Sequence, residues 1–171
     1  MAEATVWTRV AVEEDADAVA QIYNEGIDDR VATFETEPRS AEDRRAAIAA
    51  ARGRYPFVVA LDGDAVVGFA SAGAYRSRPC YRGIGEFSVY VARSHRGRGV
   101  GRALLAALIA EAERLGFWKL VSRVFPENAP SRALCRAMGF REVGVYEKHG
   151  KLGGVWRDCV IVERLIPANL T

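Results

Sequence analysis

The stretch of the sequence with the clearest chemical meaning is rich in glycine and runs from His95 to Leu105, HRGRGVGRALL. It lies between an apolar segment that ends in SVYVA and a second apolar segment, LLAALIAEAERLG. A glycine-rich turn that opens a helix can bind an anion, because glycine lets the backbone approach closely and the first N–H groups of a helix have no partners. We interpret the stretch as a phosphate-binding loop, with a glycine turn that holds no ligand as the alternative.

Two common phosphate-binding loops fit this stretch poorly. A Walker A loop places Gly-Lys-Ser or Gly-Lys-Thr before its helix, and the stretch has no lysine, serine or threonine there. A dinucleotide fingerprint has the spacing GxGxxG after a first strand, whereas Gly97, Gly99 and Gly101 alternate strictly and follow the fourth or fifth expected strand. If the loop binds a phosphate, we therefore expect a ligand of another kind.

The elements that must position this loop alternate between strand and helix patterns. Period-two alternation and apolar residues three and four apart distinguish them. The expected strands are residues 5–12, two strands in 56–75 around Asp62-Gly63, 84–92, 119–125, and two strands in 141–166 joined by 149–154. The expected helices are residues 13–29, 41–53, 101–116 and 129–140. This order predicts a mixed α/β sheet with helices packed on it, and 171 residues suit one domain, 1–171.

Composition argues against several classes of protein. The 24 Lys and Arg against 22 Asp and Glu give a net charge of +2, without the excess of a general nucleic-acid binder. Cys80, Cys135 and Cys159 are widely spaced, so neither a disulfide framework nor a metal site is expected. The longest apolar run, ALLAALIA, is shorter than the roughly 20 residues of a membrane span, and the first residues do not resemble a signal peptide. We expect a soluble cytoplasmic protein with no metal and no membrane or nucleic-acid partner.

The pattern from Arg96 to Gly101 resembles the pyrophosphate loop of the GCN5-related N-acetyltransferases (GNAT), which is Gln/Arg-x-x-Gly-x-Gly/Ala. A second segment, NAPSRALCRAMGF from Asn128 to Phe140, is similar to that family's Asn-x-x-(Ala/Ser)-x-x-(Leu/Phe)-Tyr-x-x-x-Gly-Phe. The resemblance covers the whole chain and implies the GNAT fold, with about six to seven strands and about four helices, and acetyl-coenzyme A as co-substrate. The coenzyme-binding residues it implies are Val89, Tyr90, Val91, Arg96, Gly97, Arg98, Gly99, Val100, Gly101, Arg102, Asn128 and Ser131.

Within that family the chain is most similar to phosphinothricin- and arsinothricin-type N-acetyltransferases, through TFETEP, RYPFVVA, GFASAGAYRSRPCY, GEFSVYV and WRDCVIVERL. The resemblance implies acetylation of the α-amino group of a small amino-acid analogue, which would confer resistance to a toxin or antibiotic. It suggests Phe34, Arg76, Arg78 and Tyr81 as substrate-binding residues, since two guanidinium groups and a phenol can bind a tetrahedral oxyanion. The alternatives are solvated or coenzyme-binding arginines and a phenylalanine that only packs.

Glu86 is the candidate general base. It lies in the strand before the glycine loop, and strict alternation places it on one face with Ser88 and Tyr90. An amine acceptor arrives as an ammonium and must lose a proton before it attacks a thioester, and apolar neighbours such as Ile84 and Phe87 would make a carboxylate a stronger base. A surface acid on an edge strand is the alternative.

Cys135 departs from the family pattern. Many family members have a tyrosine there that protonates the leaving thiolate, and a neutral thiol with an ordinary pKa of about 8.5 can also donate a proton. We therefore include Cys135 as a second candidate catalytic residue. A small residue that packs its helix is the alternative.

Other acceptors and another class of function stay open. Methionine sulfoximine, methionine sulfone or another amine, including a protein N-terminus, is the alternative acceptor, and a non-catalytic acetyl-coenzyme A sensor is the alternative of another class. The resemblance also suggests a homodimer with HGKLGGVW near the interface, where His149 and Trp156 would reach the pocket of the partner.

Overall fold

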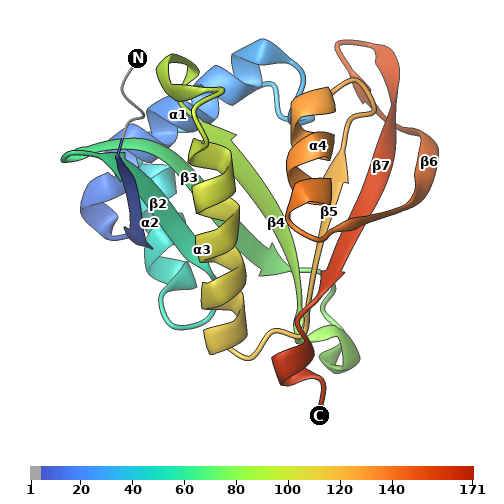
Figure 1. Ribbon diagram of the computed structural model, residues 1–171. Coiled ribbons are helices and arrows are strands. Elements are labelled where there is room, and N and C mark those ends of the chain that lie inside the picture. Colours follow the sequence, from blue (N-terminus) through green and yellow to red (C-terminus); the bar gives the residue numbers. More distant parts are fainter. Residues whose placement is uncertain (1–4) are drawn as a thin grey trace.

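The chain forms a seven-stranded sheet in the order β1-β2-β3-β4-β5-β7-β6 in this computed structural model, which describes residues 5–171 (Figure 1). The strands are β1 Val6–Val10, β2 Phe57–Asp62, β3 Ala65–Ala74, β4 Ile84–Val91, β5 Lys119–Val124, β6 Arg141–Leu152 and β7 Val155–Leu165. The α-helices are α1 Ala16–Asp29, α2 Ala41–Ala51, α3 Val100–Arg114 and α4 Ala129–Ala137. The predicted α/β class and the predicted order of strands and helices are confirmed.

Short-range signals account for several element boundaries. Ser40 caps α2, because its hydroxyl oxygen accepts a hydrogen bond from the Asp43 backbone N–H at 3.1 Å. Asp62 and Gly63 lie at the hairpin between β2 and β3, as the sequence predicts. These boundaries depend only on residues close in sequence, which is why the sequence specifies them.

The helices cover both faces of the sheet (Figure 1). On one face α3 buries Leu104, Leu105 and Leu108 completely, in a core that also includes residues of α4. On the other face α1 and α2 pack on a second core that contains Phe69 and Tyr90. Because side chains alternate along a strand, Phe87 of β4 belongs to the first core and Tyr90 to the second.

Strands β4 and β5 separate at the centre of the sheet. They pair in parallel only from Ile84 to Glu86 on β4, against Lys119–Val121 on β5. Beyond this point the strands diverge toward the end where α3 and α4 begin (Figure 1). One side-chain hydrogen bond spans the start of the gap, from the Ser122 hydroxyl to the Phe87 carbonyl oxygen at 2.7 Å. A sheet opened in this way leaves space for a ligand between two central strands.

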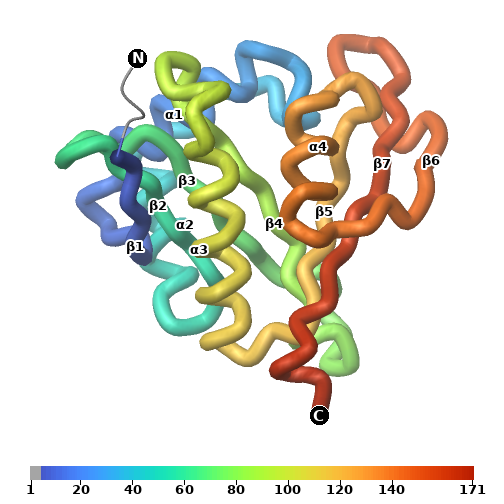
Figure 2. The backbone as a smooth tube through the Cα atoms, viewed as in Figure 1, coloured from blue at the N-terminus to red at the C-terminus, as the bar shows by residue number. Residues whose placement is uncertain are grey.

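The segment between α1 and α2 crosses the open end of this gap. Figure 2 shows it passing from the end of α1 toward the start of α4. The Asn128 amide donates a hydrogen bond to the Val31 carbonyl oxygen at 3.1 Å, and the rings of Phe34 and Phe125 meet edge to face at 4.9 Å between centroids. The segment therefore forms a wall over the gap, although it has no regular secondary structure.

One expected boundary, in the C-terminal hairpin, is wrong. Residues 149–154 do not all lie in a connection, because β6 continues to Leu152 and only Gly153 and Gly154 form the turn. The pairing of β6 with β7 is irregular between Tyr146 and Gly150, where Lys148 has a φ of 47° and its N–H donates to an Asp158 carboxylate oxygen at 2.7 Å. His149 follows Lys148 in this bulge, and its Nε2 lies 3.5 Å from Nη1 of Arg123 on β5.

Two structural features are absent within residues 5–171. None of the helices there combines the length and apolar character needed to cross a lipid bilayer. The same residues contain no group of three or more histidine, cysteine, aspartate or glutamate side chains arranged to hold a metal ion.

Candidate active site

The glycine loop has the conformation that the predicted anion site requires. Gly97 and Gly99 have φ values of 73° and 82°, in the left-handed region that side chains disfavour. Gly99 is the N-cap of α3, and no side chain caps this helix end. The first N–H groups of α3 are therefore free of side-chain acceptors and carry the positive end of the helix dipole.

A pocket of about 520 Å³ lies beside this loop, between the end of β4 and the start of α4. It is lined by eleven of the twelve residues predicted to bind the coenzyme, Val89, Tyr90, Val91, Arg96, Gly97, Gly99, Val100, Gly101, Arg102, Asn128 and Ser131. Arg98 is exposed and does not line it. Gly26 and Asp29 of α1 and His95, at the start of the glycine-rich stretch, also line the pocket, and nothing in the local sequence pattern marks the two α1 residues as site residues.

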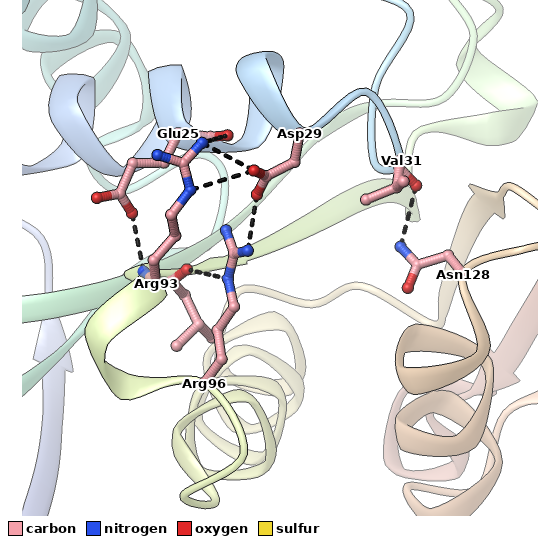
Figure 3. Close-up of polar contacts among 7 residues, drawn as sticks. Glu25, Asp29, Val31, Arg93, Arg96 and Asn128 are labelled. Atoms are coloured by element: carbon pink, nitrogen blue, oxygen red, sulfur yellow. Dashed lines mark hydrogen bonds and ion pairs between the residues drawn. The ribbon is translucent and has the colours of Figure 1, made fainter.

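An ion-pair network fixes the start of the glycine loop to the end of α1 (Figure 3). The Asp29 carboxylate contacts Arg93 at 2.8 Å and Arg96 at 2.7 Å, and the Arg96 Nε also donates to the Val91 carbonyl oxygen at 3.1 Å. Burial opposes ionisation of Asp29, but the hydrogen bonds from Arg93 and Arg96 outweigh it and lower the pKa of the carboxyl group. Arg96 thus faces a protein carboxylate as well as the pocket.

Asn128 links the two sides of this pocket. Its side-chain oxygen accepts a hydrogen bond from the Ser131 N–H at 3.2 Å and so caps α4, while its amide holds Val31 on the wall segment. Both contacts are within the protein, so Asn128 has a clear structural function. Its predicted contact with the coenzyme stays a prediction.

A second pocket, of about 370 Å³, adjoins the first. Phe34, Glu86 and Ser88 are among its lining residues. Ala32 and Tyr90 line both pockets, so the two spaces meet there. The predicted base and the predicted anion loop therefore face connected pockets. We call the pocket of about 370 Å³ the acceptor pocket.

Glu86 lies on the predicted face of β4, because the register with β3 is continuous from Gly68 to Ala74 and no bulge shifts it. The expectation that apolar groups surround the Glu86 carboxylate, however, is wrong. Phe87 points to the opposite face, and the neighbouring strand β5 brings Arg123 to the carboxylate, with Nε and Nη2 at 3.1 and 2.5 Å from Oε1. Glu86 is an ion-paired acid on an inner strand, and it is neither isolated by apolar groups nor on an edge.

Tyr90 is a neutral phenol at the junction of the two pockets. Burial, followed by the nearby Tyr23, raises its pKa above the ordinary value, and the Tyr23 ring packs edge-on against it at 5.0 Å. Tyr90 thus contributes a fixed aromatic wall at the point where the two pockets meet.

Cys135 is buried in the core beneath α4, with 5% of its surface exposed, and it also lines the narrow gap between β4 and β5. Burial, with a smaller contribution from the Glu142 carboxylate, raises the pKa of its thiol to about 11. The thiol is therefore protonated at neutral pH. A protonated thiol fits both a proton donor and a packing residue, and the catalytic role of Cys135 stays a prediction.

The predicted substrate-binding residues divide into two groups. Phe34 lines the acceptor pocket, as expected, and is also packed against Phe125 and the backbone of Gly150. The other three lie on the connection between β3 and β4 and are not among the residues that line this pocket, namely Arg76, Arg78 and Tyr81. The Arg76 guanidinium instead lies over the Tyr75 ring, 4.7 Å from its centroid.

Comparisons with known proteins agree with this arrangement. A model described as Acetyltransferase (GNAT) family matches residues 19–140. The phosphinothricin N-acetyltransferase of Streptomyces coelicolor is 33% identical over 165 residues, which are 94% of this chain and 96% of that protein. The L-methionine sulfoximine/L-methionine sulfone acetyltransferase of Pseudomonas paraeruginosa is 35% identical over 151 residues, which are 87% of this chain and 88% of that protein.

A solved structure supports the same assignment. The GNAT superfamily phosphinothricin acetyltransferase from Sinorhizobium meliloti, in complex with AcCoA, is 36% identical with a TM-score of 0.88, and the match covers 95% of this chain and 89% of that one. The predicted GNAT fold is thus confirmed. The chain belongs to the acetyltransferase (GNAT) family and is an N-acetyltransferase.

Proposed function

We propose that this enzyme transfers an acetyl group from acetyl-coenzyme A to the α-amino group of a small amino-acid analogue such as phosphinothricin or arsinothricin, and so confers resistance to it. The observation that carries the proposal is the meeting of the two pockets at Ala32 and Tyr90, with the glycine loop on one side and Glu86 on the other. The names of the relatives support the class of acceptor.

The pocket of about 520 Å³ beside the glycine loop, which we call the coenzyme pocket, has the features that this co-substrate needs. The N–H groups that follow Gly97 and Gly99 suit a pyrophosphate, and Val89 and Val91, on the part of β4 that is not paired with β5, suit the pantetheine arm. A backbone N–H near Val89 or Val91 would polarise the thioester carbonyl. When bound, acetyl-coenzyme A supplies the activated acetyl group.

In this proposal Glu86 accepts a proton from the ammonium of the acceptor, directly or through water. The neutral amine then forms a C–N bond to the acetyl carbon while the C–S bond breaks, and the departing sulfur takes up a proton. Cys135 is one candidate donor of that proton, because its thiol is protonated at neutral pH, and water or the departing amine proton is the alternative. Direct transfer requires only that the two substrates meet in the correct orientation.

Methionine sulfoximine or its sulfone is the second candidate acceptor, favoured by the name of the Pseudomonas relative. Both candidates carry a tetrahedral polar group at the far end of an amino acid. We propose that Arg76, Arg78 and Tyr81 bind that group, since the β3–β4 connection follows Gly73, which pairs directly with Glu86.

We also propose a cytoplasmic homodimer built from a single domain, residues 1–171. The β6–β7 hairpin supports the dimer, because it exposes about half of each of five large apolar side chains, Val143, Val145, Tyr146, Val155 and Trp156. His149 lies on the same hairpin.

The test is release of coenzyme A thiol with phosphinothricin, arsinothricin, methionine sulfoximine, methionine sulfone and glutamate as acceptors. In the same assay Glu86→Gln should lower kcat at neutral pH about 100-fold or more while acetyl-coenzyme A still binds, because a general base contributes about that much. Glu113→Gln, on the exposed surface of α3, is the matched control. Unchanged turnover of Glu86→Gln would exclude Glu86 as the base.

A further inference from the structure

The charges that face the acceptor pocket are few. Within residues 5–171 its lining includes two acids, Glu35 and Glu86, and a single cationic side chain, Arg123. Glu35 already pairs with Arg39 at 3.1 Å. An acceptor that enters therefore meets one carboxylate and one guanidinium as its main charged partners, and these two groups also contact each other.

Arg123 and Glu86 each keep free bonding capacity in this pair. The Arg123 Nε and Nη2 both contact Oε1 of Glu86, while Nη1 lies 3.5 Å from the His149 Nε2 and has no acidic partner among the described residues. The second carboxylate oxygen of Glu86, Oε2, accepts no hydrogen bond from residues 5–171. The two side chains are 49% and 28% exposed, so a small molecule can reach both.

This arrangement is complementary to a zwitterion. An α-amino acid carries an ammonium and a carboxylate on the same carbon atom, so it needs an anionic and a cationic partner side by side. We propose that Arg123 binds the α-carboxylate of the acceptor through its Nη1 side while Oε2 of Glu86 receives the ammonium, which makes Arg123 the residue that selects α-amino acids over other amines. This inference rests on the proposed function and adds a substrate requirement to it.

The chemistry of the guanidinium supports such a selection. It presents five N–H donors in a rigid plane and binds carboxylates strongly, because the hydrogen bonds are charge-assisted. A site built to bind a charged group discriminates against an analogue that lacks it, since the partner in the site is then left without its bond. Arg76 and Arg78 do not line this pocket, so they do not compete with Arg123 for the α-carboxylate there.

The experiment compares two acceptors that differ only in the α-carboxylate, L-methionine sulfone and 3-(methylsulfonyl)propylamine, by thiol release. For the wild-type enzyme we expect kcat/KM to favour the amino acid. Arg123→Ala should lower kcat/KM for the amino acid about 30- to 100-fold more than for the amine, the loss expected for a charge-assisted pair. Any change in the basicity of Glu86 affects both acceptors equally, so the ratio isolates binding of the carboxylate.

Control variants separate this role from a structural one. Arg123→Lys should retain part of the preference, mainly through KM, whereas Arg141→Ala, at an exposed arginine paired with Glu163 on the hairpin, should leave the ratio unchanged. The affinity of each variant for acetyl-coenzyme A, measured by calorimetry, shows whether it is folded. If Arg123→Ala slows both acceptors by the same factor, Arg123 only positions Glu86 and the inference is wrong.

The same assay distinguishes a failure of the proposed function. If the wild-type enzyme acetylates the amine as readily as the amino acid, N-acetylation stands but selection by Arg123 is wrong. If it acetylates none of the amino acids in the acceptor panel, the proposed class of acceptor is wrong, and the inference falls with it.

Discussion

Gly68 lies where β3, β4 and α3 come closest together, and replacing it with alanine should disturb both stability and the coenzyme site. A Cβ atom at this position would lie 2.8 Å from Leu104 Cδ1, 3.0 Å from the Tyr90 carbonyl oxygen and 3.2 Å from Val100 Cγ1. Leu104 is 0% exposed and the contact with Tyr90 is to its backbone, so neither yields easily. The added methyl group must push α3 away from the sheet or displace β4.

The size of the effect follows from two opposing contributions. Overpacking a dense core costs about 1–3 kcal/mol, and alanine in place of glycine recovers about 0.4–1 kcal/mol by restricting the unfolded chain. We therefore expect Gly68→Ala to lower the free energy of unfolding by about 1–2 kcal/mol. For a chain of this length that corresponds to a fall in Tm of about 2–8 °C.

The assay is thermal unfolding together with calorimetric titration of acetyl-coenzyme A. Binding should weaken as well, because Val100 is the first residue of α3 and follows the glycine loop directly. Gly73→Ala is the matched control in the same strand, since a Cβ there would meet nothing within 4 Å, and we expect it to raise Tm by about 1–4 °C. Equal melting temperatures for the two variants would refute the packing argument.

Two further predictions concern groups whose pKa is displaced. Cys135→Ala should destabilise the fold by about 1 kcal/mol and leave turnover within a few-fold of wild type if Cys135 only packs, whereas loss of turnover with an unchanged Tm would identify a proton donor. Asp29→Asn should lower the free energy of unfolding by about 1 kcal/mol at pH 7, measured with urea, because it breaks two partly exposed ion pairs. Since the folded pKa of Asp29 is lowered, its contribution is complete above its unfolded value of about 3.9 and is lost as the pH falls through the folded value, so the two proteins should converge in acid.

The sequence was most informative where the site is built from neighbouring residues. Nine of the eleven predicted coenzyme residues that line the pocket lie between Val89 and Arg102, where the end of β4, the glycine loop and the first turn of α3 are continuous in the chain. Arg98, which does not line the pocket, shows the limit of a motif. It occupies a variable position between Gly97 and Gly99, and its side chain turns away to solvent.

The surroundings of Glu86 could not be predicted in the same way, because they depend on a parallel pairing. Strands β4 and β5 are joined through the loop and α3, so nothing local in the sequence brings the Arg123 side chain to Glu86. The one available signal was a charged residue, Arg123, inside the expected strand KLVSRVF. A charge inside an inner strand needs a partner, but the sequence does not say which strand supplies it.

The position of Glu86 in the sheet explains why a single ion pair can define the acceptor site. Glu86 is the last residue of β4 that pairs on both sides, with Gly73 on β3 and Val121 on β5. Its backbone is therefore held where the gap begins. Arg123 lies two residues beyond this last pair, on the part of β5 that has left β4, and its guanidinium is oriented by Glu86 itself. An acceptor that binds both Glu86 and Arg123 would therefore bridge β4 and β5 just beyond the point where their backbone pairing ends.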